Sequence, residues 1–322
     1  MRAILQKTPG DTSVLQLAET PTPEPGPNEI RVRVRAAGLN RADILQRRGL
    51  YPAPPGWPAD IPGLEYAGEV ESVDSEVTRW ELTDRVMGLV GGGAHAEYVV
   101  VHEDEVVAIP QGMSWADAAA IPEAFFTAWD ALVTRGRLQP GERALIHAVG
   151  SGVGTAAIQL VKLLKATSVG TSRSPAKLSR ATALGLDEAI DTSARGFREV
   201  LSAPVDVILD VLGGPAFFEN LEALAPRGRL VLLGFLQGAK VEGSIDSILR
   251  KRLEVVGSVM RTRSLEERAV LARDFSAYLL PAFAARKLEP VVGATFPFTR
   301  IAEAHQLMEK DENFGKIVLT WA

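Results

Sequence analysis

The segment from Leu145 to Ala157 constrains the fold more than any other part of the 322-residue chain. An apolar run typical of a buried strand leads into a turn with Gly150, Gly152 and Gly154, and then into a helical pattern. Gly152, Gly154 and Ala157 match the G-x-G-x-x-A dinucleotide fingerprint, in which the backbone and a helix N-terminus face a pyrophosphate. The alternative is a plain glycine turn between two elements. We expect a pyrophosphate to rest on Gly150, Ser151, Gly152, Val153 and Gly154.

Strand and helix patterns alternate along the chain after this turn. The helical patterns cover 155–164 and 175–184, and the apolar runs typical of strands cover 205–211, 230–233 and 255–259. The first of these runs is almost entirely Val, Ile and Leu, as expected for a parallel strand covered on both faces. This order predicts an α/β fold with a doubly wound parallel sheet of the Rossmann kind.

The first third of the chain has a different pattern, with short strand-like runs separated by Gly and Pro clusters. The stretch Ile30–Ala36 alternates apolar and charged side chains, which is typical of a half-buried strand. Short strand patterns return from about Leu288, at Val291–Val292 and Ile317–Thr320, and many short strands suggest a small antiparallel barrel. The simplest assembly uses both ends of the chain in that barrel. We therefore predict one domain from residues 1–124 and 288–322, with a second domain, 125–287, inserted in it.

The choice of nucleotide depends on the residues that follow the next strand. About 20 residues beyond the glycine turn, an NAD site carries Asp or Glu for the ribose hydroxyls. Here the chain has Ser172 and Arg173, followed by Lys177, and no acid at this point. A hydroxyl and two cations suit the 2′-phosphate of NADPH, because Arg can hold it with a planar fork. The alternative is a solvated surface pair at the start of a helix.

The composition excludes several kinds of chemistry. The chain has no cysteine, so disulfides, thiolate nucleophiles and cysteine-held zinc or iron–sulfur centres are not possible. Its four histidines have no metal-site spacing, and we expect no metal. A net charge of -5 without a basic run argues against nucleic acid or an anionic membrane as partner. No apolar run reaches the roughly 18 residues of a membrane helix, so we expect a cytoplasmic protein.

Six segments follow the order found in a known family and span almost the whole chain. They are Ala37–Asp43, Gln46–Tyr51, Pro62–Glu65, Ala119–Ala124, Leu145–Gln159 and Gly315–Leu319. With them the chain resembles the zinc-free quinone oxidoreductase (zeta-crystallin-like) branch of the medium-chain dehydrogenase/reductase superfamily, and within it the p53-inducible quinone oxidoreductase type. The resemblance implies a GroES-like β-rich catalytic domain, a Rossmann domain, NADPH as cofactor and a homodimer. Zinc-dependent relatives have Cys at the position of Asp43 and His at that of Leu64, so alcohol oxidation on a metal is not expected.

The resemblance also implies roles for single residues. Asn40 would hydrogen-bond a cofactor or substrate oxygen, or would form a turn. Tyr51 would donate to a carbonyl oxygen, or would serve as a pocket wall. Ser151 would contact the nucleotide and is a candidate catalytic residue. Thr127 would contact the cofactor, or would be an ordinary helix residue, and Lys316 would reach the cofactor phosphates.

Further candidates follow the later strands. Gly234 and Phe235 come after one parallel strand, and Ser258 and Arg261 come after another. We expect these residues at the carboxyl edge of the sheet, where cofactors bind. One departure from the family pattern is Thr192, which follows Asp191 where many members carry Tyr.

These observations predict hydride transfer from NADPH to a quinone or a similar conjugated carbonyl without a metal. A quinone is already electrophilic, so the protein needs to orient the ring and stabilise developing negative charge. Glu65 and Glu123 are interpreted as structural carboxylates. The alternatives are an enone or enoyl-thioester reductase, in which Tyr51 would matter more as a proton donor, and a non-catalytic NADPH-binding protein.

Overall fold

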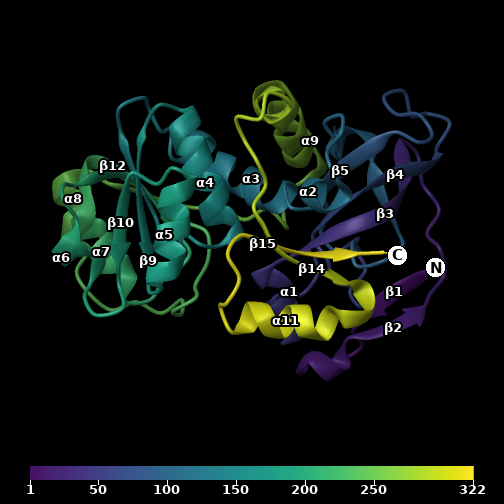
Figure 1. The fold of residues 1–322 in the computed structure, drawn as a ribbon, viewed down its shortest axis with the longest axis horizontal. Helices are drawn as coiled ribbons and strands as arrows, with labels where there is room; N and C mark the ends of the chain where they lie inside the picture. Colours follow the sequence, from purple (N-terminus) through teal and green to yellow (C-terminus); the bar gives the residue numbers. More distant parts are fainter. Residues whose placement is uncertain (322) are drawn as a thin grey trace. The chain divides into compact units, whose positions relative to one another are not determined.

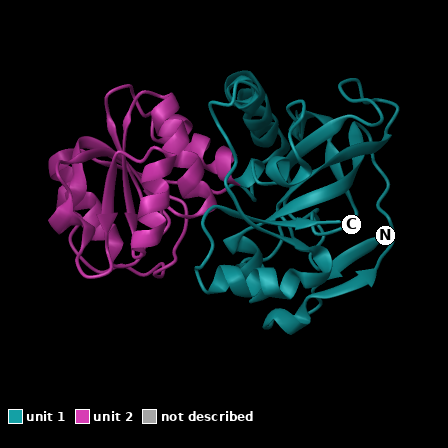
Figure 2. Ribbon diagram, in the orientation of Figure 1, with its two compact units in different colours: residues 1–123, 260–322 teal, residues 124–259 magenta. Residues whose placement is uncertain are grey.

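The computed structural model describes residues 1–321, which divide into two compact units (Figure 2). Unit 1 consists of Met1–Glu123 and the residues from Met260 onward, and unit 2 consists of Ala124–Val259. Among the described residues, no helix has the length and apolar character needed to cross a membrane.

Unit 1 is built on a seven-stranded sheet. Its longest strand, β3 (Glu29–Leu39), buries Ile30, Val32 and Val34, while the arginines between them lie on the less buried face. The strand order is β14-β15-β3-β4-β5-β7, and β6 also pairs with β3. The other strands of this sheet are β4 (Glu65–Val73), β5 (Arg85–Leu89), β6 (Tyr98–His102), β7 (Val106–Ala108), β14 (Val292–Pro297) and β15 (Lys316–Thr320). A separate antiparallel pair is formed by β1 (Arg2–Leu5) and β2 (Gln16–Glu19).

The strand β15 joins the two parts of unit 1 in one sheet (Figure 1). It runs antiparallel to β3, with Ile317 opposite Leu39 and Thr320 opposite Ala36, and parallel to β14. The strand that ends at residue 320 therefore completes a sheet that begins near residue 29. The α-helices of this unit are α1 (Arg41–Arg47), α2 (Trp115–Ala119), α9 (Leu265–Asp274), α10 (Leu280–Ala284) and α11 (Ile301–Glu309). It also has the short 3-10 helices η1 (Thr12–Val14), η2 (Glu103–Glu105) and η5 (Phe298–Arg300) and the π-helix η4 (Phe275–Leu279).

Residues 260–287 lie in unit 1, whereas the sequence places them in the inserted domain. The physical reason is the packing of α9 against β7 and η2 of unit 1. Arg268 on α9 holds the carboxylate of Glu105 with two hydrogen bonds, of 2.6 and 3.0 Å. The second boundary therefore falls after Val259 rather than after residue 287.

Unit 2 contains a six-stranded sheet in the order β10-β9-β8-β11-β12-β13, and every neighbouring pair is parallel. This is the doubly wound order of a Rossmann domain, which confirms the predicted fold class. Figure 1 shows α4 and α5 on one side of this sheet and α6 and α7 on the other. The strands are β8 (Arg143–Ile146), β9 (Thr167–Ser172), β10 (Glu188–Asp191), β11 (Val205–Asp210), β12 (Leu224–Leu232) and β13 (Glu254–Gly257). The helices are α3 (Pro122–Trp129), which begins at the end of unit 1, η3 (Asp130–Arg135), α4 (Gly152–Leu163), α5 (Pro175–Leu184), α6 (Phe197–Val200), α7 (Ala216–Ala223) and α8 (Asp246–Lys251).

Candidate functional site

The glycine turn of unit 2 connects β8 to α4. Ser151 caps the helix, since its hydroxyl accepts a hydrogen bond of 3.0 Å from the backbone N–H of Gly154. No acidic residue lies in the first turn of α4, so nothing there would repel a phosphate. The predicted contact residues Gly150 to Gly154 are therefore placed at a helix N-terminus suited to an anion.

Gly154 is required by close packing within this turn. A Cβ atom at this position would lie 2.5 Å from the carbonyl oxygen of Val149 and 2.8 Å from that of Ala148. Both contacts are with backbone, which cannot move aside as a flexible side chain can. The second glycine of the fingerprint therefore lets α4 start directly above the end of β8.

Replacing Gly154 with Ala is expected to lower the free energy of unfolding by about 1–3 kcal/mol, because the added methyl overpacks the turn. It should also weaken the association of NADPH. Urea denaturation and a titration of NADPH measure the two effects. Gly257→Ala is the control, since a Cβ there meets nothing within 4 Å. Equal stability of the two variants would contradict the packing argument.

The residues proposed for the 2′-phosphate lie at the end of the adjacent strand β9. The Ser172 hydroxyl accepts a hydrogen bond of 3.1 Å from the backbone N–H of Ser174, the cap of α5. Arg173 is exposed, and Lys177 lies in the first turn of α5. Asp191 is opposite Ser172 in the register of β10 with β9, so one carboxylate also lies at this edge.

The carboxyl ends of the parallel strands bring several predicted residues to the same edge as the glycine turn. Gly234 and Phe235 follow β12, and Phe235 is 56% exposed. Thr127 on α3 has a buried hydroxyl with no hydrogen-bond partner among residues 1–321, as expected for a group that contacts a ligand. The expectation that Ser258 contacts the cofactor is corrected in part. Its hydroxyl donates a hydrogen bond of 2.6 Å to Asp130, so that hydrogen is not available to a cofactor. Together, the turn and this row of residues fit a dinucleotide.

Lys316 does not have the role predicted for it. Its ammonium group is buried and donates to the carbonyl oxygen of Leu39 at 3.2 Å, to Oδ1 of Asn40 at 2.6 Å and to the carboxylate of Glu65. Lysine has three N–H donors, so none is left for a cofactor phosphate. The prediction that Lys316 reaches the phosphates is therefore wrong, and the side chain instead forms a buried ion pair inside unit 1.

Asn40 belongs to the same network. Its amide nitrogen donates to Oε1 of Glu65 at 2.9 Å, and its amide oxygen is taken by Lys316. Glu65 also accepts the backbone N–H of Glu123 at 2.7 Å, so its carboxylate has three partners. A Cβ on Gly38 would lie 2.0 Å from this carboxylate, which explains the glycine in β3. Asn40 thus positions Glu65 and Lys316, and Glu65 is structural as predicted.

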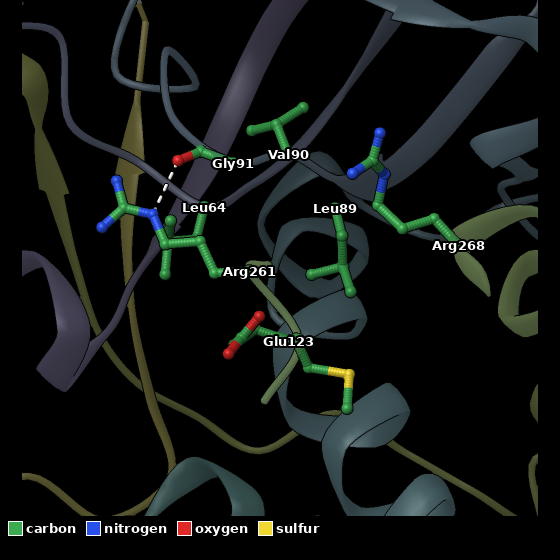
Figure 3. A pocket seen from close by; sticks show the side chains of 8 residues that line it. Leu64, Leu89, Val90, Gly91, Glu123, Arg261 and Arg268 are labelled. Atoms are coloured by element: carbon green, nitrogen blue, oxygen red, sulfur yellow. Dashed lines mark hydrogen bonds between the residues drawn. The ribbon is translucent and has the colours of Figure 1, made fainter. Parts of the chain in front are cut away.

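A small cavity in unit 1 is lined by residues for which the sequence predicted other places or other roles. Its apolar wall is formed by Leu64, Leu89, Val90 and Met260, and the polar residues that line it are Glu123, Arg261 and Arg268. Figure 3 shows the carboxyl group of Glu123 among these side chains. No single stretch of sequence contains them, and Glu123 was expected to be structural.

Arg261 holds the segment that carries Tyr51. Its guanidinium donates to the carbonyl oxygens of Gly91 at 2.7 Å and Tyr51 at 2.8 Å, and to the amide oxygen of Gln46 at 2.6 Å (Figure 3 marks the bond to Gly91). It also lies over the ring of Tyr51, 5.1 Å from the centroid. Arg261 is therefore not at the edge of the parallel sheet, as the sequence suggested, but in unit 1.

The acid groups of this cluster are shifted by burial. Burial, and then the negative charge of Glu65, raise the pKa of Glu123 to about 8. Burial, and then the charge of Glu123, raise the pKa of Tyr51 above its usual value. At neutral pH the Glu123 carboxyl is therefore mostly protonated, while the Tyr51 phenol stays protonated and can donate a hydrogen bond.

A zinc ion does not fit the residues at the position where related dehydrogenases hold one. The chain has no cysteine, and Leu64 is apolar. Both carboxylate oxygens of Asp43 are taken by backbone N–H groups, of Gly63 at 3.1 Å and of Asn40 at 2.7 Å. Within residues 1–321, no three His, Cys, Asp or Glu side chains are arranged to hold a metal ion.

Two protein families match the chain. The family described as alcohol dehydrogenase GroES-like domain matches residues 26–111, and the family described as zinc-binding dehydrogenase matches residues 184–319. Quinone oxidoreductase-like protein 2 of Mus musculus is 30% identical over 289 residues, which are 88% of this chain and 82% of that protein. Polyketide synthase GfsB of Streptomyces halstedii is 35% identical over 291 residues, covering 89% of this chain. The chain spans 5% of that synthase, so it corresponds to a small part of it.

Solved structures give the same result. A quinone oxidoreductase from Pseudomonas syringae superimposes with a TM-score of 0.88 at 30% identity, covering 99% of both chains. The CurK enoyl reductase has a TM-score of 0.88 at 28% identity, covering 100% of this chain and 99% of its own. A GroES-like unit joined to a Rossmann unit defines a two-domain oxidoreductase. The chain belongs to the medium-chain dehydrogenase/reductase superfamily, in the branch of the quinone oxidoreductase-like proteins.

Proposed function

We propose that the protein is an NADPH-dependent oxidoreductase that delivers hydride to a quinone or a similar conjugated carbonyl without a metal. The observation that carries this proposal is the turn from β8 to α4, where Ser151 caps a helix whose N-terminus carries no acid. Arg173 and Lys177, with no acid at the end of β9, support NADPH over NADH. The mouse relative is named a quinone oxidoreductase-like protein, and the Pseudomonas structure is named a quinone oxidoreductase. Both names support a quinone as acceptor.

The residues have distinct tasks in this reaction. When bound, NADPH supplies the hydride. The glycine turn holds the pyrophosphate, with Ser151 as cap and Thr127 as a further contact. Tyr51, held by Arg261, donates a hydrogen bond to the acceptor oxygen and so stabilises the charge that develops there.

A second candidate is an enone or enoyl-thioester reductase, which uses the same hydride donor. The likeness to the CurK enoyl reductase and to a polyketide synthase supports it. We also propose a homodimer, because β13 is the edge strand of the parallel sheet and Ile245 and Leu249 nearby are 68% and 80% exposed.

The test is oxidation of NADPH with a panel of ortho-quinones, para-quinones, enones and an enoyl thioester, with and without a strong chelator. We expect fastest turnover with quinones and no effect of the chelator, since no three His, Cys, Asp or Glu side chains among residues 1–321 are arranged to hold a metal ion. Faster turnover of the thioester would favour the second candidate. Saturable NADPH binding without turnover of any acceptor would instead indicate a non-catalytic NADPH-binding protein.

A further inference from the structure

Glu123 differs from the other carboxylates around it in having no partner for its carboxyl group. Asp43 is bound by two backbone N–H groups, and Glu65 is bound by three donors. The backbone N–H of Glu123 is fixed on Glu65, yet within residues 1–321 no group hydrogen-bonds the Glu123 carboxyl. This carboxyl lines the cavity beside Leu64 and Leu89 (Figure 3). Its position is therefore fixed by the backbone while its oxygens stay available.

Several charged and titratable groups act on this carboxyl. Glu65 and Asp43 oppose its ionisation, whereas Lys316 and Arg261 favour it, and burial outweighs the two cations. The result is a pKa of about 8, which is close to neutral pH. The Tyr51 phenol has a pKa raised above 10, so it holds its proton more strongly. A general acid is most effective when its pKa lies near the working pH, which favours the carboxyl over the phenol.

We propose that Glu123 is the proton donor to the oxygen of the carbonyl acceptor, next to the Arg261 guanidinium and the Tyr51 hydroxyl. This inference rests on the proposed function and deepens it. The acceptor takes up a hydride, with two electrons, from NADPH and becomes an anion on oxygen, leaving NADP⁺. The O–H bond of Glu123 breaks as an O–H bond forms on that oxygen. The carboxylate left behind takes a proton back from water, so the protein is unchanged after each turnover.

The geometry supports this assignment independently of the pKa. Glu123 and Arg261 line the same cavity, and Arg261 fixes the backbone and ring of Tyr51. The Glu123 carboxyl thus lines a cavity with an apolar wall, together with Arg261 and Arg268, and the Tyr51 ring lies against the Arg261 guanidinium. The cavity has room for an oxygen atom rather than for a ring, so the carbonyl oxygen of the acceptor would enter it and meet a hydrogen-bond donor as negative charge develops.

The experiment compares wild type, Glu123→Gln and, as the matched control, Glu312→Gln at an exposed position of the same unit. With NADPH and a para-quinone, Glu123→Gln is expected to lower kcat by about 100-fold or more while Kd for NADPH is unchanged. The wild-type kcat should fall as pH rises through about 8, where Glu123 loses its proton, and the variant profile should be flat in that range. Glu123→Asp should restore part of the activity. Urea midpoints of wild type and Glu123→Gln should agree, because Gln replaces a neutral carboxyl of the same size.

The outcomes separate this inference from the proposed function. If wild type turns over and Glu123→Gln is fully active, Glu123 is not the proton donor, and the proposed function stands. The same holds if the two proteins have the same pH profile. Loss of activity in Glu123→Gln with a lowered urea midpoint and weaker NADPH binding would mark Glu123 as structural and also overturn it. Absence of wild-type turnover with every acceptor would overturn both.

Discussion

Lys316→Met is expected to lower the free energy of unfolding by about 3–5 kcal/mol, because it leaves the buried carboxylate of Glu65 without its cation. That is a large part of the roughly 5–15 kcal/mol by which a domain is stable. The network also ties the end of β3 to β4 and β15, so the loss should affect the whole sheet of unit 1. Urea denaturation of the two proteins measures the difference.

Two further variants isolate the cause of this effect. Arg300→Met breaks an ion pair with Glu303 in which both side chains are about half exposed, and it should cost about 0–1 kcal/mol. Adding Glu65→Gln to Lys316→Met removes the unpaired charge and should restore part of the stability. A double variant no more stable than Lys316→Met would show that charge is not the cause. NADPH should bind folded Lys316→Met as tightly as wild type, since Lys316 has no donor for a phosphate.

The second large effect concerns the choice of nucleotide. Replacing both Arg173 and Lys177 with Ala is expected to raise the Michaelis constant for NADPH on the order of 100-fold, since each charge-assisted hydrogen bond contributes about 1.5–3 kcal/mol. The constant for NADH should stay within about twofold, because NADH lacks the 2′-phosphate. Steady-state kinetics with one quinone give both Michaelis constants. A direct titration of each nucleotide gives its dissociation constant.

The neighbouring acid supplies the control for this prediction. Asp191 lies opposite Ser172 on β10, so Asp191→Asn removes a negative charge from the same edge without removing a cation. This variant should bind NADPH at least as well as wild type. Equal losses for NADPH and NADH in the Arg173 and Lys177 variant would contradict the phosphate contact and indicate a general effect on the fold.

The sequence predicts those parts of the fold whose pattern is local. The helix α5 has the predicted bounds, Pro175–Leu184, because Pro suits its first turn and Gly185 ends it with a positive φ of 110°. The helix α9 was missed, although Ser264 and Glu267 form a capping box that marks its start. Its sequence has a weak apolar stripe, so periodicity alone gives little signal.

The candidate site was less predictable because its contacts join distant residues. Lys316 meets Glu65, and Arg261 meets Gly91, through pairings that no nearby residue reveals. A family likeness gives the position of such a side chain but not its hydrogen-bond partners. The carboxyl of Glu123 was missed for the same reason, since the residues around it are Leu64, the end of β5 with the two residues that follow it, the segment at 260–261 and Arg268 on α9.

The place of β15 in the sheet also sets the order in which the chain can fold as it leaves the ribosome. Residues 124–259 emerge before residues 316–320, so the parallel sheet of unit 2 can form first. Until β15 is synthesised, the side of β3 that it covers has no partner, and the ammonium group that neutralises Glu65 is absent. Until then the sheet of unit 1 has an unpaired edge at Ala36–Leu39, and an unpaired strand edge favours pairing with another chain.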